Sequence, residues 1–541
     1  MEFTDEERRK IEGHFTNADG RVFAVTTPSQ ADRGALMSRY SRTSKSMRRV
    51  FLDEFLGNES RGEQFYERVL SGYGDDSVAE LGAAQLGIEG VSNVAVKKIE
   101  DRRIGLSYLE KSSRYVKWDA KRDGKYMYYR GDDIMGSRHA GPYTDACDMA
   151  FDLYSRSIDP MTRMIQEAHP EESFMFPDSA DGREKPISEL GGEDREAAAR
   201  ARAGMARARA LDALRSLLPA ATLTNVGVTG NGRAFEYMLD VLGSSRLAEE
   251  RGIAAMAKTE LDRVIGAFVR RHGGPHGEAN RGYLGAVRAL QEEVGGAAGG
   301  EPGGPVELVE HGDEGAELDR VIAGIICEGS GSSFKSALGA AAAMDRGKKA
   351  GIVGRIASLR ANRRHRPPRA FEHVRYTFDM CTNFGMFRDL HRHRALTLQR
   401  HLLGAGLGYH VPDEIRGLGI EREFGECMGA SGDAWAAIRR DDPDLAQYPV
   451  NFAYNYRYVM SMNLREACHL IELRTMPQGH EDYRRVAISM LEQISEVHPA
   501  LAAVARFADT KRQGSGRYES ERRAELRKLK TKISNPAGGG A

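Results

Sequence analysis

The stretch that decides the fold class is AFEHVRYTFDM, from Ala370 to Met380. Aromatic and β-branched side chains alternate with polar ones along it, which is the pattern of a β-strand with one buried face. Apolar residues spaced for one face of a helix are more common elsewhere, as in NLREACHLIELR at Asn463–Arg474. A weaker strand pattern covers Leu81–Val96, and further helical patterns cover Ser41–Phe55 and Tyr483–Ile494. The sequence therefore predicts an α+β protein rather than an all-helical one.

The composition is that of an ordinary globular protein, since 41% of the 541 residues are hydrophobic and 29% are charged. The 78 basic residues balance the 78 acidic ones, which argues against a general binder of nucleic acid. No apolar run is long enough for a transmembrane helix, and the charged start MEFTDEERRKIEGHF lacks the apolar segment of a secretory signal. The five cysteines form no CxxC pair, so we expect neither a metal site nor a disulfide framework. These features favour a cytoplasmic protein without a membrane or nucleic-acid partner.

Glycine-rich sequence divides the chain into two halves. The runs GGPHGE and GGAAGGEPGG have little that can form a core, so we expect a flexible linker over 273–315. It separates an N-terminal half, 1–272, from a C-terminal half, 316–541. A polar region at Asp178–Arg209 is rich in Arg, Glu and Ala, and we expect a solvated helix or a mobile insertion there.

Three short motifs recur in the same order in both halves. An acidic-apolar segment comes first, as DDSVAEL at 75–81 and PRAFEHV at 368–374. A cluster of arginines follows, and a helix that begins with Asn-x-Arg comes later. The clusters and helix starts are Asp101–Arg103 and Arg392–Arg394, then Asn231–Arg233 and Asn463–Arg465. One such pair would be chance, but three in the same order indicate an internal duplication.

The arginine cluster of the second half is the strongest candidate for a binding site. In DLHRHRALTLQRHLLGAGLGY, at Asp389–Tyr409, the residues Arg392, His393 and Arg394 stand in a row. Guanidinium groups packed this densely suit a polyphosphate or an electron-rich ring. The alternative is a surface cluster that pairs with nearby acids such as Asp389 itself and Glu414.

Together these motifs resemble those of the flavin-dependent thymidylate synthases. The RHR triplet on a helix, the upstream Glu372-His373 pair and the late NLREACHLIELR match motifs of that family, and the resemblance covers most of both halves. It implies two tandem copies of that α+β fold, each a mixed sheet with packed helices. It also implies that Arg474 activates a pyrimidine and that six residues contact the flavin. The six are Arg392, His393, Arg394, Asn463, Arg465 and His469.

The two halves depart from the family pattern in opposite ways. The second half lacks the substrate loop, because the expected Glu, Ser and Arg are Arg400, Leu402 and Gly404. The first half lacks the RHR triplet, and its counterpart of the activating arginine is Leu242. It keeps the loop residues and a further arginine, namely Glu110, Ser112, Arg114 and Arg215. Since each half retains what the other has lost, we expect composite sites built from both halves.

The resemblance implies the reductive methylation of dUMP to dTMP by a thymidylate synthase, which is a methyltransferase. FAD would be the cofactor, with NADPH as the electron source and methylenetetrahydrofolate as the carbon donor. No cysteine lies in a recognisable nucleophile motif, so no covalent enzyme intermediate is expected. Arg114 and Arg215 would hold the nucleotide phosphate with Ser112, and Glu110 would lie between ribose and flavin. From the family's tetramer we expect a homodimer of this duplicated chain.

Two other interpretations of the chain stay open. It can be a flavoprotein of the same fold that acts on another pyrimidine nucleotide or another one-carbon donor, or a non-catalytic nucleotide-binding relative. Single residues also have structural interpretations. Arg474 can pair with Glu466 or Glu472 on its own helix, and the SSRYV segment can cap a helix. Glu110 can pair with a basic neighbour, and His469 can be a buried, satisfied histidine.

Overall fold

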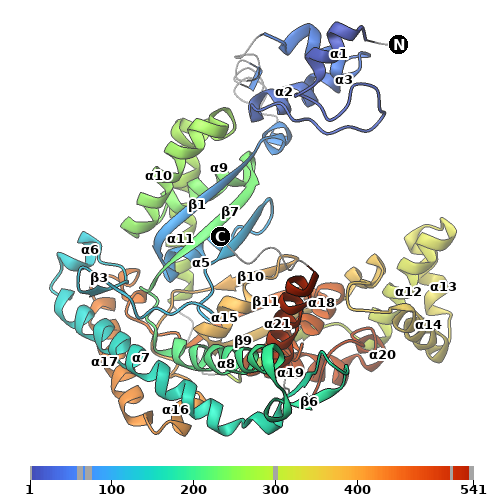
Figure 1. Ribbon diagram of the computed structural model, residues 1–541. Helices are drawn as coiled ribbons and strands as arrows, with labels where there is room; N and C mark the ends of the chain where they lie inside the picture. Colours follow the sequence, from blue (N-terminus) through green and yellow to red (C-terminus); the bar gives the residue numbers. More distant parts are fainter. Residues whose placement is uncertain are drawn as a thin grey trace. The chain divides into compact units, whose positions relative to one another are not determined.

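Two compact units make up the computed structural model, which describes residues 3–57, 62, 65–66, 76–296, 303–511 and 516–534 (Figure 1). Unit 1 comprises Met1–Lys111, Tyr129–Ser137 and Ala221–Gly300, and unit 2 comprises Ser112–Tyr128, Arg138–Ala220 and Glu301–Ala541. The units do not follow the two halves of the sequence. Two segments of the N-terminal half, 112–128 and 138–220, fold into unit 2. Residues of both halves therefore share one compact body.

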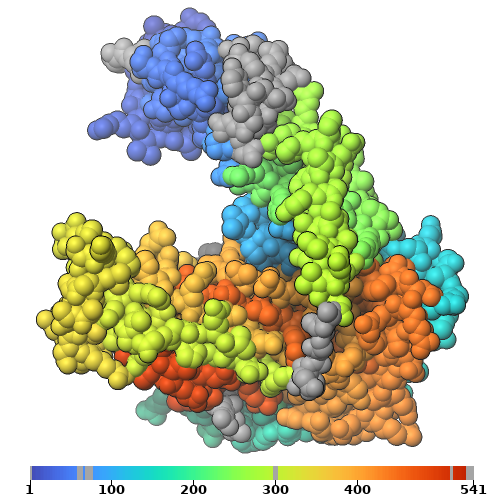
Figure 2. Space-filling view, turned by 180° about the vertical axis from the view of Figure 1, so that it is seen from behind, coloured from blue at the N-terminus to red at the C-terminus, as the bar shows by residue number. Residues whose placement is uncertain are grey.

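Unit 1 is built on a three-stranded antiparallel sheet in the order β1-β7-β2. Its strands and helices are α1 Asp5–Ile11, α2 Gln30–Tyr40, α3 Met47–Val50, β1 Ala83–Ser92, α5 Asn93–Glu100, β2 Leu106–Glu110, α6 Asp132–Met135, β7 Leu223–Asn231, α9 Gly232–Gly243, α10 Ala248–Ile265 and α11 Pro275–Gly295. The helices α10 and α11, which follow α9, are exposed on one face of this unit, in yellow-green in Figure 2.

Unit 2 is built on a four-stranded antiparallel sheet in the order β10-β11-β9-β8. Its strands and helices are β3 Lys121–Arg122, β4 Lys125–Tyr126, α7 Ala140–Ala168, β5 Met175–Pro177, β6 Glu184–Pro186, α8 Gly192–Leu214, β8 Val306–His311, α12 Glu314–Ser330, α13 Phe334–Ala342, α14 Arg346–Leu359, β9 Arg375–Asn383, α15 Phe384–Leu390, β10 Leu396–Arg400, α16 Asp413–Gly417, α17 Glu421–Arg439, β11 Asn455–Asn463, α18 Leu464–Arg474, α19 Glu481–Val497, α20 Pro499–Ala502 and α21 Gly516–Ser534. The long helices α7 and α8, which come from the N-terminal half, run side by side in Figure 1.

The same arrangement of three strands occurs in both units, as the internal duplication predicts, and unit 2 adds β8 at one edge. In each unit a central strand, β7 or β11, lies between two antiparallel partners and leads into a helix capped by an asparagine side chain, Asn231 or Asn463. The register agrees as well. Leu106 and Leu396 begin the equivalent strands β2 and β10, and each lies opposite the residue just before the capping asparagine.

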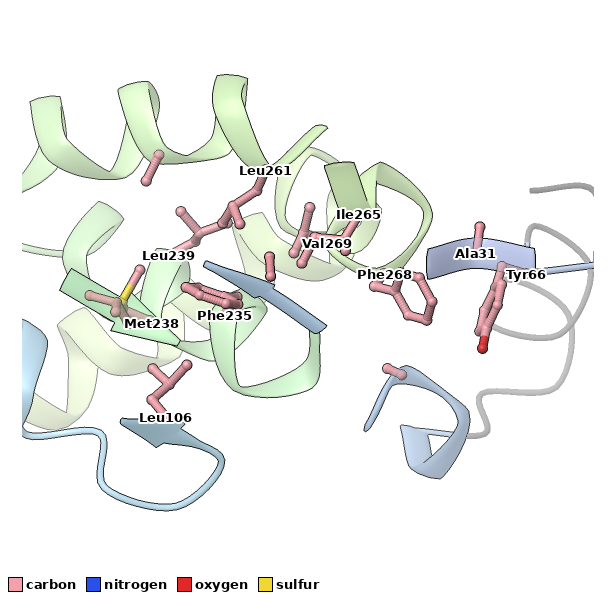
Figure 3. Packing of buried hydrophobic residues seen from close by; sticks show 14 of the residues in the cluster. Ala31, Tyr66, Leu106, Phe235, Met238, Leu239, Leu261, Ile265, Phe268 and Val269 are labelled. Atoms are coloured by element: carbon pink, nitrogen blue, oxygen red, sulfur yellow. The ribbon is translucent and has the colours of Figure 1, made fainter. Parts of the chain in front are cut away.

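Each unit has its own apolar core. In unit 1, Leu106 from β2 packs with Phe235, Met238 and Leu239 from α9 and Leu261 from α10 (Figure 3). All five are almost fully buried, and burying one such side chain contributes about 1.5–3 kcal/mol. In unit 2, every second residue of β11 is buried, which gives the central strand an apolar face. These cores fix the ends of the strands, where the candidate site lies.

Some local expectations need correction, although the α+β class and the tandem arrangement are confirmed. The strands of each sheet are antiparallel rather than mixed. The strand expected from Ala370 begins at Arg375, because a 3-10 turn covers Arg369–His373. The helix expected from Ser41 begins only at Met47.

The segment 273–315 differs from the expected linker. It contains α11 and β8, because the run after Pro275 has helix-forming residues and begins with a proline at the first helical position. The polar segment Asp178–Arg209 supplies most of α8, which buries several alanines and is therefore only partly solvated. Within the part of the chain that the structure describes, no helix has the length and hydropathy needed to span a bilayer.

Candidate functional site

The RHR triplet lies in a turn and not on a helix, which corrects the expectation. The preceding helix, α15, is capped by Asn383, whose side-chain oxygen accepts the N–H of Met386 at 2.8 Å, and it ends at Leu390. The triplet Arg392–Arg394 then leads into β10. His393 is buried, whereas the two arginines on either side of it are exposed.

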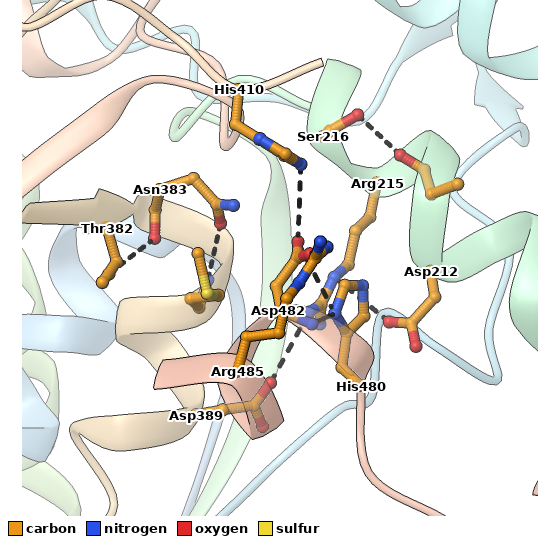
Figure 4. Close-up of polar contacts among 12 residues, drawn as sticks. Asp212, Arg215, Ser216, Thr382, Asn383, Asp389, His410, His480, Asp482 and Arg485 are labelled. Atoms are coloured by element: carbon orange, nitrogen blue, oxygen red, sulfur yellow. Dashed lines mark hydrogen bonds and ion pairs between the residues drawn. The ribbon is translucent and has the colours of Figure 1, made fainter. Parts of the chain in front are cut away.

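Asp389, in the last turn of α15, is the centre of a cluster of arginines, of which Figure 4 shows Arg215 beside it. Its side chain is only 2% exposed. Its carboxylate lies 3.8 Å from Nη2 of Arg114, 3.5 Å from Nη2 of Arg215 and 3.8 Å from Nη2 of Arg392. A fourth guanidinium, that of Arg474, donates to the backbone oxygen of Asp389. Unit 2 thus brings together two arginines from each half of the sequence, and we call these four the arginine cluster.

Arg114 and Arg215 reach this cluster from segments that the N-terminal half contributes to unit 2. Ser112 begins the turn that carries Arg114, because its carbonyl accepts the N–H of Val116 at 3.1 Å. Its hydroxyl accepts the N–H of Arg114 at 3.4 Å. Arg215 follows α8, and its Nε lies 3.3 Å from Oδ1 of the buried Asp212. The local role of Ser112 is therefore to shape the loop that presents Arg114.

Ion pairing keeps the buried groups of the cluster charged. Burial opposes ionisation of Asp389, but Arg114 and Arg215 beside it hold the pKa of this carboxyl well below its usual range. Burial likewise opposes the charge on Arg114, yet Asp389 raises the pKa of its guanidinium. For Arg474 burial prevails, and with the like charge of Arg392 it lowers the pKa. Guanidinium groups outnumber carboxylates here, so an anionic ligand would relieve an excess of buried positive charge.

Arg474 is oriented by a buried histidine. Its Nε donates to Nε2 of His393 at 3.0 Å, and Nδ1 of His393 lies 3.0 Å from Oε1 of Glu466. Because Nε2 accepts, the ring proton lies on Nδ1 and is donated to Glu466. Arg474 makes no ion pair with Glu466 or Glu472 among the described contacts, and Glu472 instead binds Arg360 at 2.6 Å. Both ring nitrogens of His393 are therefore engaged by protein groups.

The side chains of Asn463 and Arg465, at the start of α18, also form hydrogen bonds within the protein. Asn463 caps the helix by accepting the N–H of Glu466 at 2.9 Å. Arg465 donates to the carbonyl of Pro367 at 2.8 Å and to Glu372 at 3.0 Å. These contacts hold the beginning of α18 against the segment that precedes β9.

Unit 1 contains the same ion pair at the equivalent positions. Nη1 of Arg233 lies 2.8 Å from Oε1 of Glu80. In both units the arginine comes two residues after the capping asparagine, and the glutamate shortly precedes the equivalent strand, β1 or β9. A pair that both copies retain belongs to the repeated architecture, which favours a structural role for Arg465.

The surroundings of the triplet fit part of a flavin dinucleotide. Arg392 is 45% exposed and is too far from Asp389, at 3.8 Å, for a hydrogen bond. The half-buried His469 lies next to the histidine of the triplet, with its ring centre 5.7 Å from that of His393, and burial lowers the pKa of His469. Two exposed arginines next to a neutral imidazole are a donor set that suits the phosphates of FAD. Asn463 and Arg465 fit less well, because their side chains are already bonded within the protein.

Glu110 lies outside the arginine cluster. It is the last residue of β2 in unit 1, and its buried carboxylate lies 2.8 Å from Nζ of Lys97. The same ammonium group binds Glu100 at 2.5 Å. Of the two sequence interpretations, the structure therefore shows the pairing with a basic neighbour.

Several groups at the site were not expected from the sequence. Asp389 was expected only as a surface partner, although its place just before the triplet was a usable signal. Asp212 is buried between Arg215 and Arg517, and His480 and Arg215 lower its pKa against the effect of burial. Asp212 and Arg215 also line a small pocket together with His410, His480 and Asp482 (Figure 4). His410, His480 and Asp482 come from segments far from Arg215 in the sequence, so no local pattern predicts their contact with it.

Two tandem antiparallel sheets and a buried, cation-rich site define a duplicated α+β protein. The chain matches the family model described as thymidylate synthase complementing protein over residues 23–266 and 307–500. Each matched segment contains the three equivalent strands of one sheet. A UPF0159 protein of Thermoplasma acidophilum is 39% identical over 500 residues, covering 92% of this chain and 99% of the relative. A UPF0159 protein of Chlamydia muridarum is 36% identical over 545 residues, covering 96% and 98%.

A solved structure is similar as well. The UMP/dUMP methylase PolB of Streptomyces cacaoi, bound with 5-Br dUMP, is 17% identical, with a TM-score of 0.31, over 39% of this chain and 95% of that one. On the family match and the two full-length relatives, the chain belongs to the thymidylate synthase complementing protein family.

Proposed function

We propose that this protein methylates dUMP to dTMP as a flavin-dependent thymidylate synthase. The reaction replaces the hydrogen on C5 of the pyrimidine by a methyl group. Methylenetetrahydrofolate supplies the carbon, and NADPH supplies the two electrons that reduce it to the methyl level. The products are dTMP, tetrahydrofolate and NADP⁺. Membership of the thymidylate synthase complementing protein family supports this proposal, and the arginine cluster supplies its site.

The observation that carries the proposal is the meeting of Arg114 and Arg215 with Arg392 and Arg474 around Asp389. The ion pairs to the carboxylate are 3.5–3.8 Å long, whereas a charge-assisted hydrogen bond is about 2.7–2.9 Å. The guanidinium groups are thus gathered but not tightly bound by Asp389. A nucleotide phosphate can take their N–H donors without breaking strong bonds. Arg114 and Arg215 are its primary ligands in this proposal.

Arg474 activates the pyrimidine ring. Its guanidinium is almost fully buried and is held by His393 and by the backbone of Asp389, so its direction is fixed before the substrate binds. Negative charge that develops along the N3–C4 side of the ring during attack from C5 is stabilised by this fixed cation. Burial raises the pKa of the Cys468 and Cys427 thiols to about 12 and about 11, so these two cysteines are not poised as thiolate nucleophiles.

FAD would be held by Arg392 and Arg394 through its phosphates, with His469 beside it. When bound, the flavin passes reducing equivalents from NADPH to the carbon that is transferred. Asn463 and Arg465 shape the wall behind His469 by holding the start of α18. His393 orients Arg474 and does not contact the flavin in this proposal.

We further propose a cytoplasmic homodimer that imitates the tetramer of the single-copy family members. Its partners are small molecules, dUMP and the folate, rather than nucleic acid or a membrane. Because the chain is duplicated, two chains supply four copies of the fold. Each composite site would then take its substrate loop from the first half of the sequence. It would take its RHR triplet and its activating arginine from the second half.

The direct test is the formation of dTMP from dUMP by the purified full chain. We expect product only when FAD, NADPH and methylenetetrahydrofolate are all present, and each is omitted in turn as a control. Methylation of UMP but not dUMP would replace the substrate in this proposal by another pyrimidine nucleotide. Absence of any methylated product from a protein that binds neither FAD nor dUMP would overturn the proposal in favour of a non-catalytic relative.

A further inference from the structure

The C-terminal helix α21 lies outside both segments that match the family, since the second of them ends at residue 500. It packs along α8, the long helix that the N-terminal half contributes to unit 2. Tyr518 fastens its first turn, because its ring centre lies 4.2 Å from that of Phe174 and its hydroxyl donates to the carbonyl of Met175 at 3.2 Å. Further along, Arg200 donates to Glu525 at 2.9 Å. This chain therefore adds a docked helix to the repeated fold.

The start of α21 approaches the loop that follows the arginine cluster's Arg474. Gly516 is the first residue of α21, and a Cβ atom there would lie 2.2 Å from the backbone carbonyl carbon of Pro477. A side chain cannot lie that close to backbone, so glycine is what permits the approach. Pro477 comes three residues after Arg474, which ends α18. The first turn of α21 is thus held beside the candidate site.

Arg517, the second residue of α21, reaches the site through the buried carboxylate of Asp212. Nη2 of Arg517 donates to Oδ2 of Asp212, and Oδ1 of Asp212 lies 3.3 Å from Nε of Arg215 (Figure 4). The side chain of Asp212 is only 4% exposed. Burial opposes its ionisation, but the positive charges of His480, Arg215 and Arg517 hold its pKa below the ordinary value. Asp212 therefore stays charged between two guanidinium groups.

Arg215 has two carboxylates within reach. Its Nη2 lies 3.5 Å from Asp389, and its Nε faces Asp212. A buried carboxylate that loses its partner is strongly destabilising, so Asp212 without Arg517 would be paired mainly by Arg215. Arg215 would then have fewer donors for an anion, and the positive charge of the site would fall by one. Arg517 prevents both effects because it binds the other oxygen of Asp212.

We infer that Arg517 is a positioning residue for the phosphate of the substrate, and that α21 completes the phosphate site. Arg517 does not contact the nucleotide. It neutralises Asp212, so that Arg215 remains available to the anion. Its effect on dUMP rests on the function proposed above, whereas its effect on inorganic phosphate does not.

The test is calorimetric titration of the full chain with dUMP, deoxyuridine and inorganic phosphate, together with KM and kcat for dUMP. In Arg517→Ala the Kd for dUMP and for phosphate should rise by about tenfold or more, which corresponds to about 1.4 kcal/mol. KM should rise with Kd, while kcat at saturating dUMP stays within about twofold, because Arg474 is unchanged. Deoxyuridine has no phosphate, so its affinity should not change. Arg517→Lys keeps the charge and should retain most of the affinity.

A second substitution separates positioning from simple docking of the helix. In Asp212→Asn/Arg517→Ala no carboxylate at position 212 competes for Arg215, so the dUMP affinity should return to within about threefold of the wild type. Arg522→Ala is the matched control. Arg522 lies on the same helix, is 16% exposed against 18% for Arg517, and likewise forms an ion pair, with Glu184. It should keep the KM and the dUMP affinity of the wild type.

Unchanged dUMP affinity in Arg517→Ala overturns the positioning role of Arg517. A double variant that binds dUMP as weakly as Arg517→Ala overturns it too, because the loss would then come from displacement of the helix. If the wild type binds inorganic phosphate but not dUMP, the proposed methylation fails, and weaker phosphate binding in Arg517→Ala still supports the positioning role. A wild type that binds neither anion overturns both.

Discussion

Nε of Arg474 donates to Nε2 of His393 at 3.0 Å, so the histidine of the RHR triplet holds the arginine at the end of the late helix. The two residues are far apart in the sequence and carry the two motifs that pointed to a flavin-dependent methylase. Their contact shows that the two motifs lie together in the same site. The triplet contributes orientation through its histidine and positive charge through its arginines.

Replacing Arg474 tests the activation of the pyrimidine. We expect Arg474→Ala to lower kcat by about 10²–10³, which is the usual effect of removing one fixed electrostatic group at a transition state. Flavin binding should persist, because Arg392 and Arg394 are intact. Turnover of dUMP and the visible spectrum of the same sample measure the two effects. Normal turnover in Arg474→Ala would remove the catalytic assignment, and Arg440→Ala on the exposed end of α17 serves as the control.

The contact between His393 and Glu466 predicts a pH effect. Burial raises the pKa of Glu466, and on protonation this carboxyl no longer accepts the Nδ1–H of His393. Activity is therefore present above this pKa and falls as the pH drops through it, at a pH above the ordinary value of about 4.3. In Glu466→Gln we expect kcat lowered by about tenfold and the acid limb removed, with dUMP affinity within about twofold of the wild type.

The control for this pH profile is Glu492→Gln, an exposed position on α19. It should retain the acid limb of the wild type. An identical acid limb in Glu466→Gln would show that another group sets the profile and that Glu466 has no positioning role.

Truncating the two first-half arginines tests the phosphate site. Arg114→Ala and Arg215→Ala should each weaken dUMP binding by about 2 kcal/mol or more, a factor of roughly 30, if each makes a buried charge-assisted contact. Binding of deoxyuridine, which has no phosphate, should be unchanged. Isothermal titration of both ligands separates the two cases. Equal dUMP affinity in variant and wild type would place the nucleotide elsewhere.

Asp389 predicts a link between stability, pH and anions. Its pKa is lowered in the folded protein, so its contribution to stability is present above the unfolded pKa of about 3.9 and is lost as the pH falls toward the folded value. In Asp389→Asn this acid-dependent loss should be smaller between pH 5 and pH 3, as measured by urea unfolding. At pH 7 the variant should lose about 3–5 kcal/mol, because buried arginines remain without their partner.

Inorganic phosphate or dUMP should restore part of the stability lost in Asp389→Asn. A ligand that binds only the folded state stabilises it, and the variant has the stronger need for an anion. The increase in Tm with phosphate should therefore be larger in the variant than in the wild type. Equal increases would mean that the cluster does not receive the anion.

Much of the fold was predictable because its signals are local. Alternation placed the strand that becomes β9, and the apolar periodicity of Asn463–Arg474 placed α18. The capping preference of asparagine sets the beginning of both late helices. The error at 273–315 arose because glycine content was weighed above the helix-forming run that follows Pro275, and tertiary contacts with Asp240 stabilise that helix.

The sequence predicted which arginines belong to the candidate site, but it did not predict how they are arranged. The sequence motifs named Arg114, Arg215, Arg392 and Arg474, and the structure places all four around one carboxylate. The contacts of Arg114 with Asp389 and of Glu466 with His393 join segments far apart in the chain. Such contacts have no period or spacing, so residue patterns do not reveal them. Glu110 is a case in which the motif is present but the expected role is not seen. Its carboxylate is bound to Lys97 instead of lying in the arginine cluster.

The measurement that tests the central claim most directly is the visible absorption spectrum of the full chain, loaded with FAD and titrated with dUMP. The account predicts a bound-flavin spectrum that shifts as dUMP fills the arginine cluster and that does not respond to deoxyuridine at the same concentration. A protein that takes up no FAD, or a flavin band that ignores dUMP, would contradict it.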